Sequence, residues 1–190
     1  MSKNIKLVGV GGQGTILAAK ILCSALIDAG YDVKMSEIHG MSQRGGSVSS
    51  EIRFGDKVYS PVIEKGHVDY LVSFEQMEAA RMIDYLKHDG TLIVNNHKIN
   101  SMITLNGKIK YPENIIEELS GKVRTISIDG TKKAIELGNA KAMNIIMLGA
   151  LVQAMGITHL NFEKALQENI KPKFIDINLK AFNLGCEISK

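Results

Sequence analysis

The first thirty residues constrain the fold most, because their order predicts a strand, a glycine turn and a helix. Ile5 to Val10 is a compact apolar run that ends in Gly9-Val10-Gly11-Gly12-Gln13-Gly14. Thr15 to Ala29 then has the apolar spacing of a helix, and Gly30 stops it. Such a unit opens a doubly wound sheet, so we expect an α/β fold: a three-layer, Rossmann-like, mostly parallel sheet.

The next segment departs from that plan. Val33 to Glu37 is typical of a second strand, which the usual connection rule makes parallel to the first by a right-handed crossover. Ile38 to Gly46 is polar and glycine-rich where a second helix is expected. Ser47 to Phe54 alternates in polarity, and Gly55-Asp56 would turn it into Lys57 to Ser60. We therefore predict an inserted β-hairpin at the sheet edge.

The rest of the chain is predicted to resume the alternation of strands and helices. In chain order the predicted elements are strands at Tyr70 to Phe74 and Thr91 to Val94 around a helix from Glu75 to about Lys87, a hairpin from Ile103 to Ile109 turning at Asn106-Gly107, a helix from Pro112 to about Leu119, a strand from Val123 to Ile128, and helices beyond Asp129 with breaks near Gly138, Gly156 and Pro172.

The helix predicted from about Lys141 to Met155 is apolar on nearly all sides. Two interpretations compete for it. We favour a core helix packed under the sheet. The alternative is a face against a partner subunit, since flexible methionine side chains suit adaptable interfaces.

Length and composition indicate one globular domain. The chain has 190 residues, which predicts a single domain spanning residues 1–190. Its 23 basic and 20 acidic side chains leave a net charge of +3 without a run of like charge, so nucleic acid is not expected as a partner. No signal peptide is recognised, and the apolar stretch from Met143 to Met155 is too short to cross a bilayer. We therefore expect a cytoplasmic protein that does not contact membranes.

The residues that carry redox, metal or acid–base chemistry are sparse. Cys23 and Cys186 lie far apart and lack neighbouring Cys or His at metal spacing, so they cannot form a four-cysteine iron–sulfur cluster or a structural zinc site. We expect both to be buried free thiols in a reducing compartment. No nucleophile beside a base, pair of carboxylates at useful spacing or metal constellation is recognised. We therefore predict no catalytic residue and no metal ligand, and an enzyme that is not self-sufficient.

The glycine turn is the first candidate binding site. Gly9 and Gly11 would let the chain turn tightly beside a bound group, and Gly14 would let the helix pack on the strand. The unpaired amides at the helix start would face an anion such as a diphosphate. A purely structural tight turn is the alternative. The candidate residues here are Gly11, Gly12, Gln13, Gly14 and Thr15.

A second candidate cluster runs from Glu37 to Ser47, at the predicted carboxyl end of the second strand. We expect it to lie beside the glycine turn, where open α/β sheets bind ligands. Arg44 would pair with a phosphate in two-pronged fashion, and Gly45 and Gly46 would allow close backbone approach. A solvated loop with one surface arginine is the alternative. His39 is more often a turn residue than an acid or base in such a loop.

Glu37 tests whether the anion is a nicotinamide dinucleotide, because it lies where such enzymes place the carboxylate that binds ribose. A surface carboxylate is the commoner explanation, and no hydride-transfer group accompanies it. Asn95-Asn96-His97-Lys98 would line the same rim, although turn chemistry explains these residues equally well. Two rival functions remain open on this evidence: a stand-alone NAD(P)-binding Rossmann oxidoreductase and a non-catalytic nucleotide-binding regulatory module.

Three segments together resemble a known family. They are Gly9 to Lys20, Ser36 to Val48 with its His-Gly-Met-Ser-Gln-Arg-Gly-Gly run, and Glu51 to Gly55. The chain is similar to the gamma-type subunit or domain of the 2-oxoacid:ferredoxin oxidoreductases. The similarity continues through Asp69 to Glu75 and to Asn144 and Leu148-Gly149-Ala150, so it covers nearly the whole chain. The short length and the histidine-containing run are most similar to the indolepyruvate-type members.

The resemblance implies an accessory subunit of an oxygen-sensitive complex that oxidatively decarboxylates an indolepyruvate-type or arylpyruvate-type 2-oxoacid to an acyl-CoA and passes electrons to ferredoxin. It implies that a larger alpha subunit carries thiamine diphosphate, magnesium and [4Fe-4S] clusters. In the related pyruvate enzymes the matching domain takes part in binding coenzyme A (CoA). For this chain the resemblance therefore implies that the phosphates of CoA contact the segment Gly11 to Gly14 and the side chain of Arg44.

Overall fold

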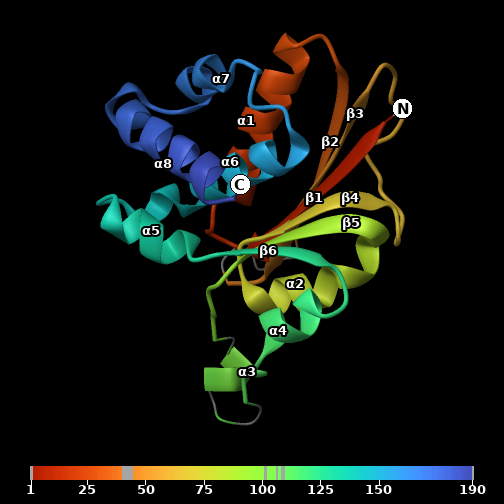
Figure 1. Cartoon of the computed structure of the whole chain (residues 1–190), viewed down its shortest axis with the longest axis vertical. Coiled ribbons are helices and arrows are strands. Elements are labelled where there is room, and N and C mark those ends of the chain that lie inside the picture. Colours follow the sequence, from red (N-terminus) through yellow and green to blue (C-terminus); the bar gives the residue numbers. More distant parts are fainter. Residues whose placement is uncertain (1, 40–44, 101, 106, 108–109, 190) are drawn as a thin grey trace.

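A mostly parallel sheet forms the centre of the molecule. The computed structural model describes residues 2–39, 45–100, 102–105, 107 and 110–189. Within these residues the strands are β1 (Lys3–Val10), β2 (Asp32–His39), β3 (Ser47–Gly55), β4 (Val68–Ser73), β5 (Leu86–Asn95) and β6 (Arg124–Ile128). They form one sheet in the order β2-β3-β1-β4-β5-β6 (Figure 1).

The pairing of the strands confirms the predicted α/β class. β1 pairs in parallel with β4, β4 with β5, and β5 with β6. β3 alone runs the other way, antiparallel to β1 on one side and to β2 on the other. β2 therefore has the predicted direction relative to β1, but β3 lies between the two strands.

The predicted pairing of the strand Ser47 to Phe54 with the segment Lys57 to Ser60 is wrong. β3 pairs with β2 and β1, whereas residues 57–60 form no strand. Side chains of the sheet bind this segment instead. The Val58 amide donates to Asp32 Oδ2 at 2.9 Å, and the Arg53 guanidinium donates to the Ser60 carbonyl at 3.1 Å. Since these backbone groups are met by side chains, the segment needs no ladder partner.

Helices cover both faces of the sheet (Figure 1). One face carries α1 (Thr15–Asp28), α5 (Gly130–Glu136), α6 (Met143–Met155), α7 (Phe162–Asn169) and α8 (Ile175–Ile188). The other carries α2 (Gln76–Met82) and α4 (Ile115–Ser120), while α3 (Met102–Leu105) lies on an excursion away from the body. Short 3₁₀ turns span Ile83–Tyr85, Ala140–Ala142 and Pro172–Phe174. The predicted three-layer arrangement and the helical C-terminal part are confirmed.

Two local predictions are wrong. The helix predicted to reach Lys87 ends at Met82, because Leu86 is buried and pairs with Val68 as the start of β5. The first arm of the hairpin predicted at Asn106-Gly107 is the helical turn α3, where Gly107 N–H donates to the Thr104 carbonyl at 3.1 Å. Residues 106, 108 and 109 of that hairpin lie outside the described residues.

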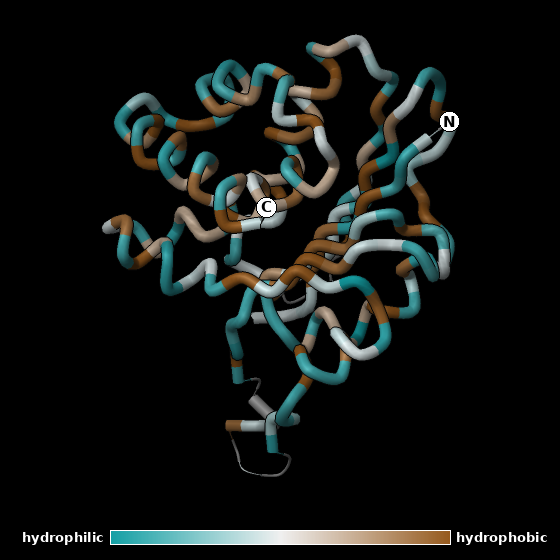
Figure 2. The backbone as a smooth tube through the Cα atoms, viewed as in Figure 1, coloured by the Kyte–Doolittle hydropathy of each residue, from teal (hydrophilic) through white to brown (hydrophobic). Residues whose placement is uncertain are grey.

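The core interpretation of the apolar helix is confirmed. Every residue of α6 from Met143 to Val152 is buried, and Figure 2 shows the hydrophobic colouring concentrated in the central strands and the helices packed on them. α6 packs closely on α8 at Gly149 and Gly185. A Cβ at Gly185 would overlap the carbonyl oxygen of Ile146, so the two helix backbones touch.

The two thiols differ in environment. Both cysteines are free; Cys23 is buried and Cys186 is half-buried. Burial raises the pKa of the Cys23 thiol to about 12. The expectation of a buried free thiol is thus confirmed for Cys23 and only partly for Cys186. In the described part of the chain, no helix has the length and apolar character needed to cross a membrane.

Candidate functional site

The glycine turn between β1 and α1 leaves the start of α1 without a side-chain cap. Gly12 and Gly14 have φ angles of 104° and 83°, which favour glycine. Gly14 is the N-cap of α1, no side chain caps the helix, and its first turn has no acidic residue. The helix dipole and the free amide groups of this turn therefore favour an anion at this point.

The side chain of Gln13 holds the turn closed. Its Oε1 accepts a hydrogen bond from the Val10 amide at 2.7 Å, and its Nε2 donates to the Phe74 carbonyl at 2.9 Å. A Cβ at Gly9 would lie 2.9 Å from Gln13 Oε1, so glycine is needed there for the side chain to fit. Gln13 thus supports the turn from within, while Thr15 is buried at the start of α1.

The structure brings the two predicted glycine segments together. Gly11 N–H donates to the Gly46 carbonyl at 2.8 Å, and Gly45 N–H donates to the Gly11 carbonyl at 3.4 Å. Both segments lie at the carboxyl end of β1, the edge where open α/β sheets bind ligands. Arg44, the third member of the predicted cluster, lies outside the described residues.

A cleft of about 380 Å³ opens beside the turn. It is lined by Gly11, Gly12, Gly14, Thr15, Ile16, Glu37, Ile38, Val48 and Ser49. Glu37 is the one charged side chain among these described residues, and the rest of the lining is glycine backbone, the apolar Ile16, Ile38 and Val48, and the hydroxyl-bearing Thr15 and Ser49. The cleft therefore offers amide donors on one wall and a carboxylate on the other.

Asn95, Asn96 and Lys98 are not among the residues that line this cleft. Asn95 is fully buried, donates to Thr131 Oγ1 at 2.9 Å and accepts from the Thr131 amide, so it fixes the start of α5 on the sheet. Asn96 and Lys98 line a separate hollow of about 240 Å³. His39 ends β2, and its side chain lies outside the described part of the chain. Asn95, Asn96 and Lys98 therefore do not line the rim predicted for them.

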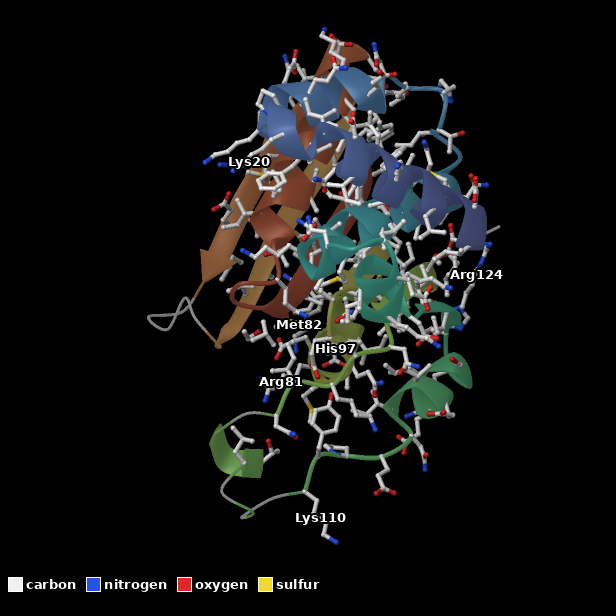
Figure 3. All side chains as sticks on the ribbon, turned by 90° about the vertical axis from the view of Figure 1, so that its left-hand side faces the viewer. Lys20, Arg81, Met82, His97, Lys110 and Arg124 are labelled. Carbon is white, nitrogen blue, oxygen red and sulfur yellow. The ribbon has the colours of Figure 1, made fainter. Side chains whose placement is uncertain are left out.

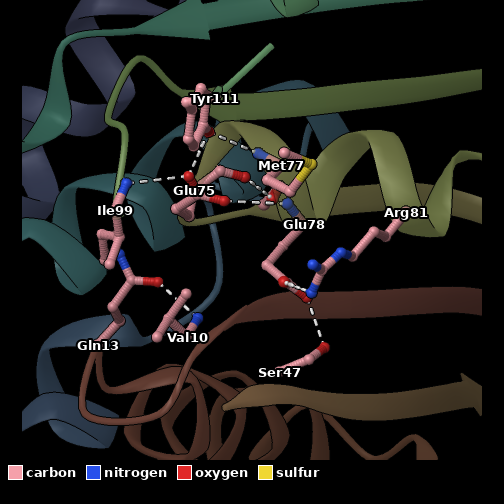
Figure 4. A network of polar contacts seen from close by, with 10 residues as sticks. Val10, Gln13, Ser47, Glu75, Met77, Glu78, Arg81, Ile99 and Tyr111 are labelled. Atoms are coloured by element: carbon pink, nitrogen blue, oxygen red, sulfur yellow. Dashed lines mark hydrogen bonds and ion pairs between the residues drawn. The ribbon is translucent and has the colours of Figure 1, made fainter. Parts of the chain in front are cut away.

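A buried carboxylate between β4 and α2 was not predicted from the sequence. Glu75 follows β4, is 1% exposed and caps α2 by accepting from the Glu78 amide at 3.0 Å (Figure 4). Its other oxygen accepts the Tyr111 hydroxyl and the Ile99 amide. Burial and the hydrogen bond to Glu75 raise the pKa of Tyr111 above its ordinary value. The available signal was the glutamate directly after a strand with another glutamate three residues later.

Glu78 is a second buried carboxylate and joins α2 to β3. It is 2% exposed, its Oε2 accepts the Ser47 hydroxyl at 2.5 Å, and its Oε1 pairs with Arg81 at 2.9 Å (Figure 4). The Arg81 side chain remains half exposed on the surface shown in Figure 3. Since both oxygens of Glu78 are occupied, this residue supports the start of β3 rather than a ligand.

The chemistry that the site offers is binding. Within the described residues, no three His, Cys, Asp or Glu side chains gather at metal-binding distance. The backbone amides of the turn can hold an anion, and the apolar walls of the cleft can hold an uncharged chain.

Comparison with known proteins gives a consistent family. A family model described as pyruvate ferredoxin/flavodoxin oxidoreductase matches residues 4–188. The chain is 40% identical over 195 residues to the indolepyruvate oxidoreductase subunit IorB of Pyrococcus horikoshii, and the match covers 98% of this chain and 96% of the relative.

Solved structures agree in fold. The gamma subunit of a keto/oxoacid ferredoxin oxidoreductase from Geobacter sulfurreducens is 27% identical with a TM-score of 0.77, covering 100% of this chain and 97% of that one. A 2-oxoglutarate:ferredoxin oxidoreductase from Magnetococcus marinus, solved with 2-oxoglutarate, coenzyme A and succinyl-CoA, has a TM-score of 0.77 at 19% identity, over 99% of this chain and 31% of that one, and shows the fold alone. This chain therefore belongs to the pyruvate ferredoxin/flavodoxin oxidoreductase family, as the motifs predicted.

Proposed function

We propose that this chain is the small accessory (beta) subunit of an indolepyruvate-type 2-oxoacid:ferredoxin oxidoreductase of the cytoplasm. The complex would convert an arylpyruvate and CoA to an acyl-CoA and carbon dioxide, with two electrons passed to ferredoxin. The near full-length similarity to the Pyrococcus horikoshii subunit supports this substrate class. Thiamine diphosphate, magnesium and [4Fe-4S] clusters would reside on a larger alpha subunit and supply the decarboxylation and electron transfer.

One observation carries the part that we assign to this chain. The start of α1 has no side-chain cap and borders a cleft in which Glu37 is the one charged side chain among the described lining residues. The amides of Gly12 and Gly14 are suited to hold the diphosphate of CoA, while the Gly11 amide is engaged with the Gly46 carbonyl. Arg44 would add a charge-assisted contact from the adjoining segment. The carboxylate of Glu37 repels further negative charge. The uncharged part of CoA would therefore lie beside Glu37.

The chain would then act by positioning. A CoA molecule fixed at the glycine turn presents its thiol to the partner's site in one orientation, which converts a bimolecular encounter into an ordered one. Docking of this subunit over the reacting centre would also exclude water from it. The hydrogen bonds donated by the Gly11 and Gly45 amides hold the two glycine segments side by side. The glycine turn and Arg44 would therefore contact the same ligand.

Replacing Arg44 tests this assignment in the complex. We expect Arg44→Ala in the anaerobically purified holoenzyme to raise the KM for CoA about ten-fold or more, through loss of a charge-assisted contact, while CoA-independent release of carbon dioxide from indolepyruvate is retained. Arg124→Ala is the matched control, because Arg124 is exposed on the opposite edge strand from β2. Loss of both activities together would assign the segment to assembly.

A dinucleotide is the rival ligand, because Glu37 does line the cleft. Separate titrations of the purified chain with NADH and with CoA distinguish the two. Binding of NADH without CoA would overturn the proposal. Recovery of a brown, thiamine-dependent complex by anaerobic affinity purification would support it, whereas recovery of this chain alone with full activity would contradict it.

A further inference from the structure

β2 is an edge strand of the sheet, and its outer side is open. β3 pairs with it on the inner side, and no described strand lies beyond it (Figure 1). The strand has eight residues, keeps one register along β3 and contains no proline. Sheet edges are commonly shielded by a bulge, a proline or a very short strand, and none of these protects the described residues of β2. The outer backbone N–H and C=O groups of β2 can therefore pair with another strand.

The side chains in the first half of β2 divide between the two faces of the sheet. Val33 and Met35 lie on the face that α1 covers, where both line a groove beside that helix. Asp32 and Lys34 alternate with them on the opposite face and form an ion pair. Both charged side chains remain partly exposed. This half of the strand therefore has an apolar face and a face with one acid and one base.

An apolar wall beside this edge is uncovered in the single chain. A groove of about 460 Å³ lies between α1, β2 and α7, and Ile27, Val33 and Met35 form its apolar side. Ile27 is 59% exposed. Tyr31 lies directly before β2 and is also exposed, and its ring meets that of Phe54 edge-on at 5.3 Å between centroids. The edge therefore carries apolar surface that a second strand would partly bury.

Two-fold symmetry limits how two copies of this chain can pair through β2. In antiparallel pairing, residues directly opposite each other point to the same face, so the two-fold axis passes between one residue and its own copy. With the axis at Val33, Asp32 of each copy lies opposite Lys34 of the other. Tyr31 of each copy then lies opposite Met35 of the other. Opposite charges and apolar side chains that face each other across strands both stabilise the pairing.

Other positions of the axis are less complementary. An axis at a charged residue of the strand places like charges opposite each other, which excludes Asp32, Lys34 and Glu37. An axis at Met35 or Ser36 places Glu37 opposite an apolar side chain. An axis at Ile38 pairs Glu37 with His39, which the charges allow, but it leaves the groove uncovered. The register about Val33 is therefore the one that charge and apolar surface both favour.

We propose that two copies of this chain form a dimer by antiparallel pairing of β2 about Val33. The two sheets join into one, Asp32 and Lys34 pair across the axis, and Tyr31 of each copy covers Met35 of the other. The paired stretch is 31–35, and the residues of β2 that line the cleft at the glycine turn lie outside it. This inference goes beyond the proposed function, which does not state how many copies of the chain the complex holds.

Sedimentation of charge variants of the full chain tests the inference. We expect the parent to sediment as a dimer, and Lys34→Asp and Asp32→Lys each to raise its dissociation constant about ten-fold or more, because like charges then face each other twice. An equimolar mixture of the two variants should recover the dimer, since each acid again lies opposite a base. Lys65→Asp is the matched control, because Lys65 belongs to an exposed ion pair with Asp84 away from β2. A monomeric parent, or a mixture that dissociates like its components, would overturn the inference.

Thiol crosslinking tests the register. In a Cys23→Ala/Cys186→Ala background, oxidation or a short thiol crosslinker should join two copies of Val33→Cys, whose Cβ atoms lie about 5 Å apart across the axis. Two copies of Ile38→Cys lie ten residue steps apart in this register, about 33 Å, and should not be joined. A crosslink at Ile38 without one at Val33 would assign the rival register and contradict the inference.

The holoenzyme separates this inference from the proposed function. We expect the anaerobically purified complex to hold two copies of this chain and to give the same Val33→Cys crosslink. If the complex is active with a single copy, and β2 gains protection from hydrogen exchange only on assembly, the larger subunit covers this edge. The inference then fails while the proposed function stands.

Discussion

The side-chain amide of Asn144 donates a hydrogen bond to the carbonyl of Gly14 at 3.1 Å, joining the turn before α1 to the first turn of α6. A Cβ at Gly14 would lie 2.5 Å from the same Nδ2 atom. Gly14, which shapes the glycine turn, is thus also held by a side chain of α6 that lies 130 positions later in the sequence. The turn before α1 and the first turn of α6 therefore share one contact.

This contact predicts the cost of a methyl group in the turn. We expect Gly14→Ala to lower the free energy of unfolding by about 2 to 4 kcal/mol, because it adds strain at a φ of 83° to an overlap with Asn144. Gly12→Ala is the control, since its φ is 104° but open space surrounds its Cβ position. Urea denaturation of both variants measures the difference. Equal losses would show that the Asn144 contact contributes nothing.

The close approach of α6 and α8 predicts a larger loss. In Gly185→Ala the new Cβ would meet the Ile146 carbonyl of α6, so the helices must move apart and core contacts are lost. We expect a decrease of at least about 3 kcal/mol in the free energy of unfolding. Gly121→Ala, whose Cβ would meet only ordinary contacts at 3.6 Å, should change it little. A thermal or urea unfolding series with both variants checks this, and a stable Gly185→Ala protein would contradict the packing described.

The buried ion pair of Lys6 and Glu51 predicts that substitutions of these two residues have non-additive effects on the free energy of unfolding. The side chains are 2% and 3% exposed and lie 2.5 Å apart, and Glu51 also accepts the Ile63 amide at 3.1 Å. We expect Lys6→Met to cost about 3 kcal/mol, because it leaves a buried carboxylate without its partner. Adding Glu51→Gln removes that charge yet keeps an acceptor for Ile63. The double variant should therefore recover much of the loss in denaturant unfolding; a fully additive loss would argue against the pair.

Tyr111 predicts a loss of stability at high pH. Its pKa in the folded chain is above the ordinary value of 10.0, through burial first and then the hydrogen bond to Glu75. The folded state therefore retains the phenolic proton where the unfolded state releases it. The resulting stabilisation is present below pH 10 and disappears as pH rises through the raised pKa. Between about pH 9 and pH 11, the free energy of unfolding should fall less in Tyr111→Phe than in the parent chain. Tyr59→Phe, at an 86% exposed position, should behave like the parent, and a parallel response of Tyr111→Phe would refute the assignment.

Local patterns in the sequence were sufficient for β1, the glycine turn, α1 and the core position of α6. Each depends on neighbours within a few residues: an apolar run, a glycine at the required φ, or apolar residues on all sides of a helix. The family was also predictable, because its motifs are continuous in the sequence. The glycine segments around Gly11 and Gly46 were expected to lie together, and the structure places them 2.8 Å apart between N–H and carbonyl.

The partner of β3 could not be predicted in the same way. Its alternation shows that it is a strand but does not say which edge it joins, because every strand presents the same backbone donors and acceptors. Glu75 was missed for a related reason. A glutamate after a strand is usually solvated, and only the packing of Tyr111 and Ile99 around it made it a buried acceptor.

The sequence by itself therefore determined the class of fold, the glycine turn and the family, since these follow from short-range backbone preferences and continuous motifs. Only the tertiary structure decided the insertion of β3 between β2 and β1, and only it brought Asn144 to the turn at Gly14. Those arrangements depend on which distant surfaces exclude water from one another. That choice is made by the packing of the whole chain and leaves no periodic signal in any one segment.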